Sequence, residues 1–377
     1  MYGMDSITQG LLGAVTAQLG FRQRIGRDAT WLAAGAAMLP DLDVLVRPIL
    51  SLSGMETDGL TMVTIHRGLS HSLLMVPLIA LPVALIWWQV RRPRNNRRDN
   101  NLYGTAPEQE AGPAPRGGKP PPFWLLYACL LAAVLSHPLL DWCTSYGTQL
   151  LLPITNARYA IDTVPIIDII YTPILAVTLI ACYVVHKVTP ARAARWTLIL
   201  GWAGMALSSG YIAAGRAMHD LAVRRALGGL DPSSVITADA YPSLGTIFLW
   251  RTVVRTQDQW RVAGVHVFSS RPLQPACAPQ ADNEWVRRAM ELQDARVFDW
   301  FAMGRTRASY ARRDGLHFVE FHDMRYGLRP DSLETLWGLR VTFDQDGSLV
   351  QIHRFHAGGG FSLREAVRTA WKGLWNP

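Results

Sequence analysis

The residues of this chain best suited to chemistry are histidines and aspartates set beside long apolar stretches. His137 and Asp141 lie four residues apart within PFWLLYACLLAAVLSHPLLDW, a stretch about as long as a membrane span. Residues four apart in a helix lie on one face, one turn from each other. An ionisable pair at membrane depth is costly unless a charge, a metal or water compensates it, so the pair predicts a functional site. The alternative is an interhelical hydrogen bond with a structural role only.

Two further motifs offer metal ligands. PDLD at 40–43 carries Asp41 and Asp43, whose carboxylates suit a divalent cation, although the motif alone is more often a turn with solvated acids. HRGLSHS at 66–72 places His66, Arg67 and His71 directly before an apolar helix. Imidazole suits zinc, manganese or iron, and arginine suits an oxyanion such as phosphate. The alternative for the histidines is a surface loop, and we expect the serines to cap the following helix.

The segment NARYAIDTVPIIDIIYTP supplies three more candidates, Arg158, Asp162 and Asp168. Asp168 lies just inside a predicted helix, where a carboxylate without a partner is expensive, so we expect it in the site rather than Asp162. For Arg158, binding of a substrate anion and contact with lipid headgroups are equally favoured.

Composition divides the 377 residues into two parts. Residues 1–215 are rich in Leu, Ala, Ile and Trp with long uncharged runs, whereas residues 216–377 carry charges throughout. This pattern predicts an α-helical polytopic membrane domain over 1–215, followed by a smaller soluble α+β domain over 216–377. The four cysteines form no CxxC pair, so neither a zinc ribbon nor a disulfide framework is expected.

Hydropathy predicts membrane helices over 72–90, 123–142, 166–186 and 196–213, each close to the roughly 20 residues that cross a bilayer. Two shorter runs, 7–21 and 29–39, predict a helical hairpin packed into the bundle. Arginine-rich connections after 7–21, after 72–90 and between the last two spans are expected to be cytoplasmic. Residues 99–122, with Gly, Pro and Asn in excess, predict a flexible cytoplasmic loop.

This topology places the candidate site near the outer face of the membrane and the soluble domain outside the cytoplasm. It also explains the arginine clusters behind the net charge of +8, so no nucleic-acid partner is expected. Alternating patterns predict strands over 247–255, 260–268, 309–312, 316–321, 336–343 and 349–355 in an antiparallel sheet, with a helix over 284–303. No motif of this domain identifies a reaction.

The segments MDSITQGLLGA, PDLD, HRGLSHS, HPLLDWCTSYGTQLL and IDTVPIIDIIYT follow one another in this order. With them the chain resembles the YdjM-like membrane-bound metal-dependent hydrolases, also described as LexA-binding, inner-membrane-associated hydrolases. The resemblance covers roughly residues 1–215 and implies an integral inner-membrane protein with a divalent-metal hydrolase site. Carried over to this sequence, the site residues are Asp5, Asp41, Asp43, His66, His71, His137 and Asp141. Many relatives have histidine where this chain has Gln9, which is a poor metal ligand.

We therefore expect a metal-dependent hydrolase in which a bound ion, zinc or manganese, lowers the pKa of its water. The expected ligands are drawn from Asp41, Asp43, His66, His71, His137 and Asp141. Arg67 or Arg158 would balance the charge of a phosphate, and Asp168 or Asp5 would act as general base. A lipid phosphoester is the expected substrate class, and membrane lipids are the expected surroundings.

The alternative is a membrane protein without catalytic activity. It would be a metal or proton transporter, or an anchor that presents residues 216–377 to a protein partner. A transporter needs its acids and histidines spread along a path through the membrane, whereas here they gather near one end of the spans.

Overall fold

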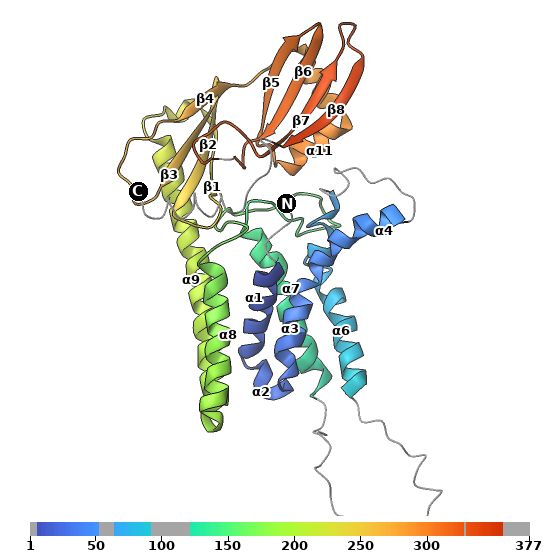
Figure 1. The fold of residues 1–377 in the computed structure, drawn as a ribbon, viewed down its shortest axis with the longest axis vertical. Helices are drawn as coiled ribbons and strands as arrows, with labels where there is room; N and C mark the ends of the chain where they lie inside the picture. The colour runs from blue at the N-terminus through green and yellow to red at the C-terminus, as the bar shows by residue number, and fades with distance from the viewer. Residues whose placement is uncertain (1–5, 53–63, 92–120, 328, 357–377) are drawn as a thin grey trace, which may run out of the picture.

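A computed structural model describes residues 6–52, 64–91, 121–327 and 329–356. They form a helical bundle with a β-rich domain at one end (Figure 1). This confirms the predicted helical membrane domain followed by an α+β domain. The expected flexible loop at 99–122 lies, up to residue 120, outside the described residues, as does Asp5.

The bundle contains two groups of helices. The first lies around the predicted hairpin and comprises α1 (Ser6–Gln18), α2 (Phe21–Ile25), α3 (Asp28–Met38), α4 (Val46–Leu52), α6 (Val76–Arg91) and α7 (Phe123–Trp142). The second is the pair α8 (Tyr171–Val188) and α9 (Ala193–Leu227). Among the described residues, α7, α8 and α9 are long and apolar enough to cross a membrane, and α3 with the segment Pro40–Leu52, bent by 46°, adds a fourth if the two form one span.

Helix α6 differs from the predicted span over 72–90. It begins at Val76 and has 16 residues, about 24 Å, which is less than the hydrocarbon thickness of about 30 Å. The reason is Ser72, whose extended backbone (φ −70°, ψ 136°) follows a 3₁₀ turn and whose hydroxyl donates to the Leu152 carbonyl. The polar motif before α6 is thus held by the loop after α7.

Close helix contacts explain how two short helices remain in the bundle. A Cβ atom on Gly13 of α1 would lie 2.4 Å from the Ala33 carbonyl oxygen of α3, so only glycine permits this approach. Ala29, Ala33 and Ala37 pack with Cys129 of α7 in the same cluster. The predicted hairpin α1–α3 therefore packs against the membrane-spanning α7.

Helix α9 joins the two parts of the molecule. It is one continuous helix of 35 residues, so the predicted domain boundary at 215/216 falls inside it. Its last turns pack under the first sheet, where Ala222 meets Trp250 and Val265 in a buried cluster. The bundle and the β-rich domain therefore share a helix rather than a linker.

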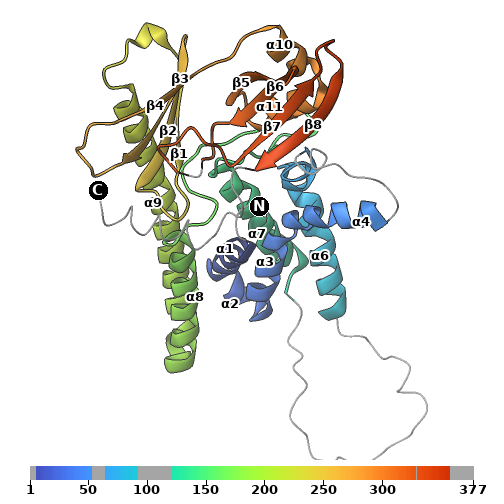
Figure 2. The same ribbon diagram turned by 45° about the horizontal axis from the view of Figure 1, so that its top comes forward.

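The β-rich domain contains two four-stranded antiparallel sheets (Figures 1 and 2). The first, in the order β1-β2-β3-β4, comprises Val235–Pro242, Leu249–Thr256, Gln259–His266 and Ala276–Pro279. The second, in the order β5-β6-β7-β8, comprises Thr306–Arg313, Leu316–Asp323, Trp337–Phe343 and Leu349–His356. Helices α10 (Glu284–Glu291) and α11 (Gln293–Phe301) replace the single predicted helix, because the extended Leu292 (φ −68°, ψ 140°) separates them.

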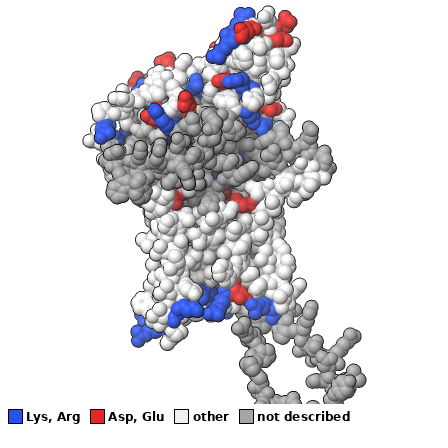
Figure 3. Space-filling view, in the orientation of Figure 1, with Lys and Arg blue, Asp and Glu red and all other residues white. Residues whose placement is uncertain are grey.

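Charge is unevenly distributed along the bundle. The face in Figure 3 has a broad band without Lys or Arg across the helices and a cluster of basic side chains at the end farthest from the β-rich domain. The ends of α2, α6 and α8 carry Arg22, Arg24, Arg91 and Lys187 there. An uncharged band bounded by polar ends is the pattern of a membrane protein.

Candidate metal centre

Three segments bring their polar side chains together at the end of the bundle nearest the β-rich domain. They are the 3₁₀ turn η1 (Pro40–Leu45) after α3, the 3₁₀ turn η2 (Leu69–His71) before α6, and the last turns of α7. Asp41, His71 and His137 come from these three segments. Among the described residues they are the one group of at least three metal-binding side chains whose ligand atoms all lie within 4.8 Å of one another.

The distances within this group are close to those between ligands of one metal ion. The Nε2 atoms of His71 and His137 are 3.0 Å apart, and Asp41 Oδ1 lies 3.6 Å from the first and 3.3 Å from the second. Ligands about 2.1 Å from a shared ion in tetrahedral or octahedral geometry are separated by about 3.0–3.4 Å. The three atoms can therefore surround one ion with little movement.

The remaining polar atom of each side chain is held by a neighbour. His137 Nδ1 donates to the Ala37 carbonyl at 2.6 Å, and Asp41 Oδ2 accepts from the Ser6 hydroxyl at 3.0 Å. His71 Nδ1 lies 2.9 Å from the Ser70 hydroxyl. Such contacts orient metal ligands and fix the imidazole tautomer. They leave the two imidazole Nε2 atoms and one carboxylate oxygen facing a common point, where they could hold a metal ion.

The surrounding electrostatics favour positive charge at this point. Burial disfavours the charged form of His71, but the adjacent carboxylates of Asp141 and Asp41 outweigh it and raise its pKa to about 9. Both carboxylates lie within 3.6 Å of His71 Nε2. The site therefore attracts a proton or a metal ion to the same place.

Asp141 lies at the edge of the group, between the imidazoles and a buried guanidinium. Its Oδ2 is 3.3 Å from His71 Nε2 and 2.9 Å from Arg67 Nε, and its Oδ1 accepts from Gln9 Nε2 at 3.1 Å. Arg67 has a left-handed backbone (φ 56°) and is fully buried. Backbone strain of this kind persists where the surrounding structure fixes it, often at functional sites.

Asp43 and His66 form a second pair beside the group. Asp43 accepts from His66 Nδ1 at 2.9 Å, from the Arg67 amide at 3.2 Å and from the Ser70 hydroxyl at 2.9 Å. Its Oδ2 also lies 3.5 Å from His71 Nδ1, so Asp43 contacts the nitrogen of His71 that does not face Asp41. His66 is 3% exposed, and its Nε2 has no hydrogen-bond partner among the described residues. Of the six predicted metal ligands, three thus form the compact group, Asp141 borders it, and Asp43 and His66 form their own pair.

The family model described as the YdjM inner membrane protein matches residues 4–217, more than half of the chain. The chain belongs to the YdjM inner membrane protein family. The matched region of this YdjM-family protein includes all residues of the centre and ends within α9. No curated protein and no solved structure matches the chain.

The other predicted catalytic residues of the YdjM-family chain lie elsewhere. Asp168 accepts from the amides of Ile170 and Tyr171 at the start of α8 and from the Tyr211 hydroxyl, and burial raises its pKa. These hydrogen bonds cap the start of α8 and use both carboxylate oxygens of Asp168, which therefore does not contribute to the metal centre. Arg158 donates to the Gly147 carbonyl at 2.6 Å, outside the group.

Sequence reasoning missed several side chains that complete the centre. Ser70 was expected to cap a helix, but it joins His71 to Asp43. Ser6 and Tyr146 carried no signal of their own. Tyr146 lies edge-on to His66 with the ring centroids 5.6 Å apart, and Arg67 lies 4.9 Å from its ring centroid. The positions of Ser6 beside Asp5 and of Ser70 beside His71 are the available sequence signals.

Proposed function

We propose that this YdjM-family protein is a membrane-bound metal-dependent hydrolase that cleaves a phosphoester of a membrane-associated substrate. The observation that carries the proposal is the convergence of Asp41 Oδ1, His71 Nε2 and His137 Nε2, each with its remaining polar atom held. Such a donor set binds the ion firmly while leaving a coordination position for water or substrate.

Asp41, His71 and His137 would hold one divalent ion, with Asp141 within reach as a further ligand. Two imidazole nitrogens and one or two carboxylate oxygens suit zinc or manganese. A bound ion of this kind supplies a water of lowered pKa and polarises a phosphoryl oxygen.

His66 and Arg67 supply the remaining functions. Because Asp43 holds His66 Nδ1, the unpartnered Nε2 is the acceptor that can take a proton from an attacking water. This role replaces the one expected of Asp168, whereas the role expected of Asp5, which lies outside the described residues, stays a prediction. Arg67 Nη2 has no hydrogen-bond partner among the described residues, so it can donate a hydrogen bond to a phosphate oxygen beside the ion.

The site is proposed to face the outside of the inner membrane. The basic ends of α2, α6 and α8 lie opposite the β-rich domain, and positive residues favour the cytoplasmic side. The centre and the β-rich domain share the other end of the bundle.

Metal analysis and phosphoester hydrolysis by the purified full chain test the proposal. We expect about one equivalent of zinc or manganese in the wild type, its loss in His71→Ala and His137→Ala, and its retention in His353→Ala, a matched exposed histidine on β8. His66→Ala should keep the metal but lose hydrolysis of bis-p-nitrophenyl phosphate and of phosphatidic acid vesicles.

Two results would contradict the proposal. Unchanged metal content in both His71→Ala and His137→Ala would exclude the metal centre. A metal-loaded wild type that hydrolyses neither phosphoester would exclude the hydrolase, and metal flux into proteoliposomes that depends on His137 would favour a transporter instead.

A further inference from the structure

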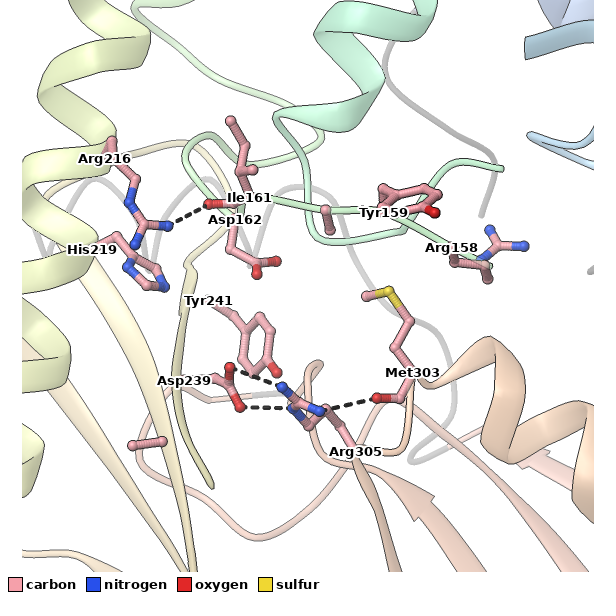
Figure 4. Close-up of a pocket in the computed structure, with 12 residues that line it drawn as sticks. Arg158, Tyr159, Ile161, Asp162, Arg216, His219, Asp239, Tyr241, Met303 and Arg305 are labelled. Carbon is pink, nitrogen blue, oxygen red and sulfur yellow. Dashed lines mark hydrogen bonds and ion pairs between the residues drawn. The ribbon is translucent and has the colours of Figure 1, made fainter. Parts of the chain in front are cut away.

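A second polar site lies away from the metal centre. A cavity of about 510 Å³ opens between the loop at 158–162, helix α9, strand β1 and the turn before β5 (Figure 4). None of Asp41, His71 and His137 is among its lining residues. Its size is that of a small-ligand pocket.

The cavity lining carries both signs of charge, and most of these groups already have partners. Asp239 forms a two-point ion pair with Arg305 at 2.7 and 3.1 Å. Arg216 donates to the Ile161 carbonyl at 3.3 Å and pairs with Asp220 at 2.6 Å. The pair with Asp220 is about half exposed, so it can exchange readily for another anion.

Asp162 differs from the other lining residues. Its Oδ1 is buried and has no hydrogen-bond partner within 3.5 Å among the described residues, and the Ser145 hydroxyl is the one side-chain donor that lowers its pKa. Figure 4 shows its carboxylate directed into the cavity, toward Tyr241 and the Asp239–Arg305 pair. A carboxylate oxygen withdrawn from water without a donor is unfavourable, so a cationic donor entering the cavity would relieve this cost.

The position of the cavity along α9 indicates that such a ligand lies at the membrane surface. Residues 196–215 of α9 carry no charge, and Trp202 and Leu207 are exposed by 56% and 63%. Arg216 is the first charged residue after this stretch and is exposed at the cavity. The end of an apolar span lies at the depth of the lipid headgroups.

We propose that this cavity binds a phosphoethanolamine group, with its ammonium on Asp162 and its phosphate beside Arg216. A primary ammonium donates up to three hydrogen bonds, whereas a quaternary ammonium donates none, so the cavity distinguishes ethanolamine from choline. The group is the headgroup of a phosphatidylethanolamine lipid or a water-soluble phosphoethanolamine ester. This inference does not depend on the proposed hydrolase activity.

Native mass spectrometry of the detergent-solubilised full chain tests the inference, with dioleoyl phosphatidylethanolamine, phosphatidylcholine and phosphatidylglycerol added at equal concentrations. We expect phosphatidylethanolamine to bind about tenfold more tightly than the other two, the effect of one charge-assisted hydrogen bond. Asp162→Asn should abolish this preference. Asparagine tolerates the left-handed backbone at this position (φ 53°), so the loop is retained.

Asp314→Asn is the matched control, because Asp314 has the same backbone conformation (φ 50°) but does not line the cavity. It should keep the preference for phosphatidylethanolamine. Metal content should be unchanged in both variants, which separates this test from that of the hydrolase.

Competition with soluble glycerophosphoethanolamine identifies the source of the ligand. Weak competition at millimolar concentration supports a lipid headgroup, and binding as tight as that of the lipid supports a water-soluble ligand of the same chemistry. Equal binding of phosphatidylethanolamine and phosphatidylcholine by the wild type, or a preference that survives in Asp162→Asn, would overturn the proposal.

Discussion

Replacement of Arg325 by methionine tests how the β-rich domain is fixed to the membrane domain. Arg325 follows β6 and is fully buried, as is Asp323, and the two form a two-point ion pair at 2.9 and 2.7 Å. The same guanidinium donates to the carbonyls of Ser145 and Tyr146 at 3.1 and 3.3 Å. It therefore joins the second sheet to the loop beside the metal centre.

The size of the expected destabilisation follows from the charge of Asp323, which remains buried when Arg325 is replaced. Without Arg325, Asp323 keeps the Trp337 indole and a backbone amide as donors but loses its buried countercharge. Breaking a buried ion pair by removing one partner costs about 3–5 kcal/mol. We expect Arg325→Met to destabilise the β-rich domain by this amount. The double variant Asp323→Asn with Arg325→Met should lose less than the sum of the single changes, because no isolated charge remains.

Urea unfolding of the detergent-solubilised protein, followed by tryptophan fluorescence, measures this loss. Arg329→Met is the control, because Arg329 forms a comparable pair with Asp331 at the surface, where the two side chains are 68% and 51% exposed. Its effect should be small, since exposed pairs contribute little. Equal destabilisation by Arg325→Met and Arg329→Met, or additive effects of the Asp323 and Arg325 changes, would refute the reasoning.

Three further outcomes are expected. Gly204→Ala should lower the thermal stability of the bundle by about 1–3 kcal/mol, because the new Cβ would lie 2.3 Å from a threonine hydroxyl of α8; Gly210→Ala, with open space around it, should not. Burial raises the pKa of Asp162 to about 6, so the protein should lose stability in urea titrations as pH rises from about 4 to 6, and Asp162→Asn should remove this slope. Gln9→His should raise zinc affinity in competition with a chelator, because an imidazole would replace the amide beside Asp141.

The sequence predicts that its motifs lie close together. It does not predict which residue of each motif faces the candidate ion and which residue holds a neighbour. In PDLD the two carboxylates are equivalent by type. The 3₁₀ geometry of η1, with three residues per turn, directs them to different sides. Asp41 therefore faces the Nε2 atoms of His71 and His137, whereas Asp43 contacts the Nδ1 atoms of His66 and His71. Only the local backbone distinguishes a ligand from the residue that orients a neighbour.

Asp168 shows the limit of reasoning from the cost of burial. A buried carboxylate needs a partner, but its burial does not determine which partner that is. Here the amides at the start of α8 and the Tyr211 hydroxyl satisfy it, so no role in catalysis is needed. Helix starts supply such free amides wherever they occur.

The helices were predicted better than the sheets. The span over Phe123–Trp142 agrees with α7, because a long apolar run has one stable form in a membrane. Strand β1, of eight residues, and the short strand β4 were not predicted, and one sheet was expected where two exist. Strand β4 has four residues and ends at Pro279, so it is too short to show the alternation of apolar and polar residues that predicts a strand.

The continuity of α9 has a mechanical consequence. A helix of 35 residues is about 52 Å long, so a tilt of about 5° about one end shifts the other end sideways by about 4–5 Å. Helices respond to bilayer thickness by tilting. Since α9 continues beneath the first sheet without a hinge, we expect a change in lipid chain length to tilt α9 and to move the sheet together with it. The cavity between α9 and the loop at 158–162 would then widen or narrow with the thickness of the membrane.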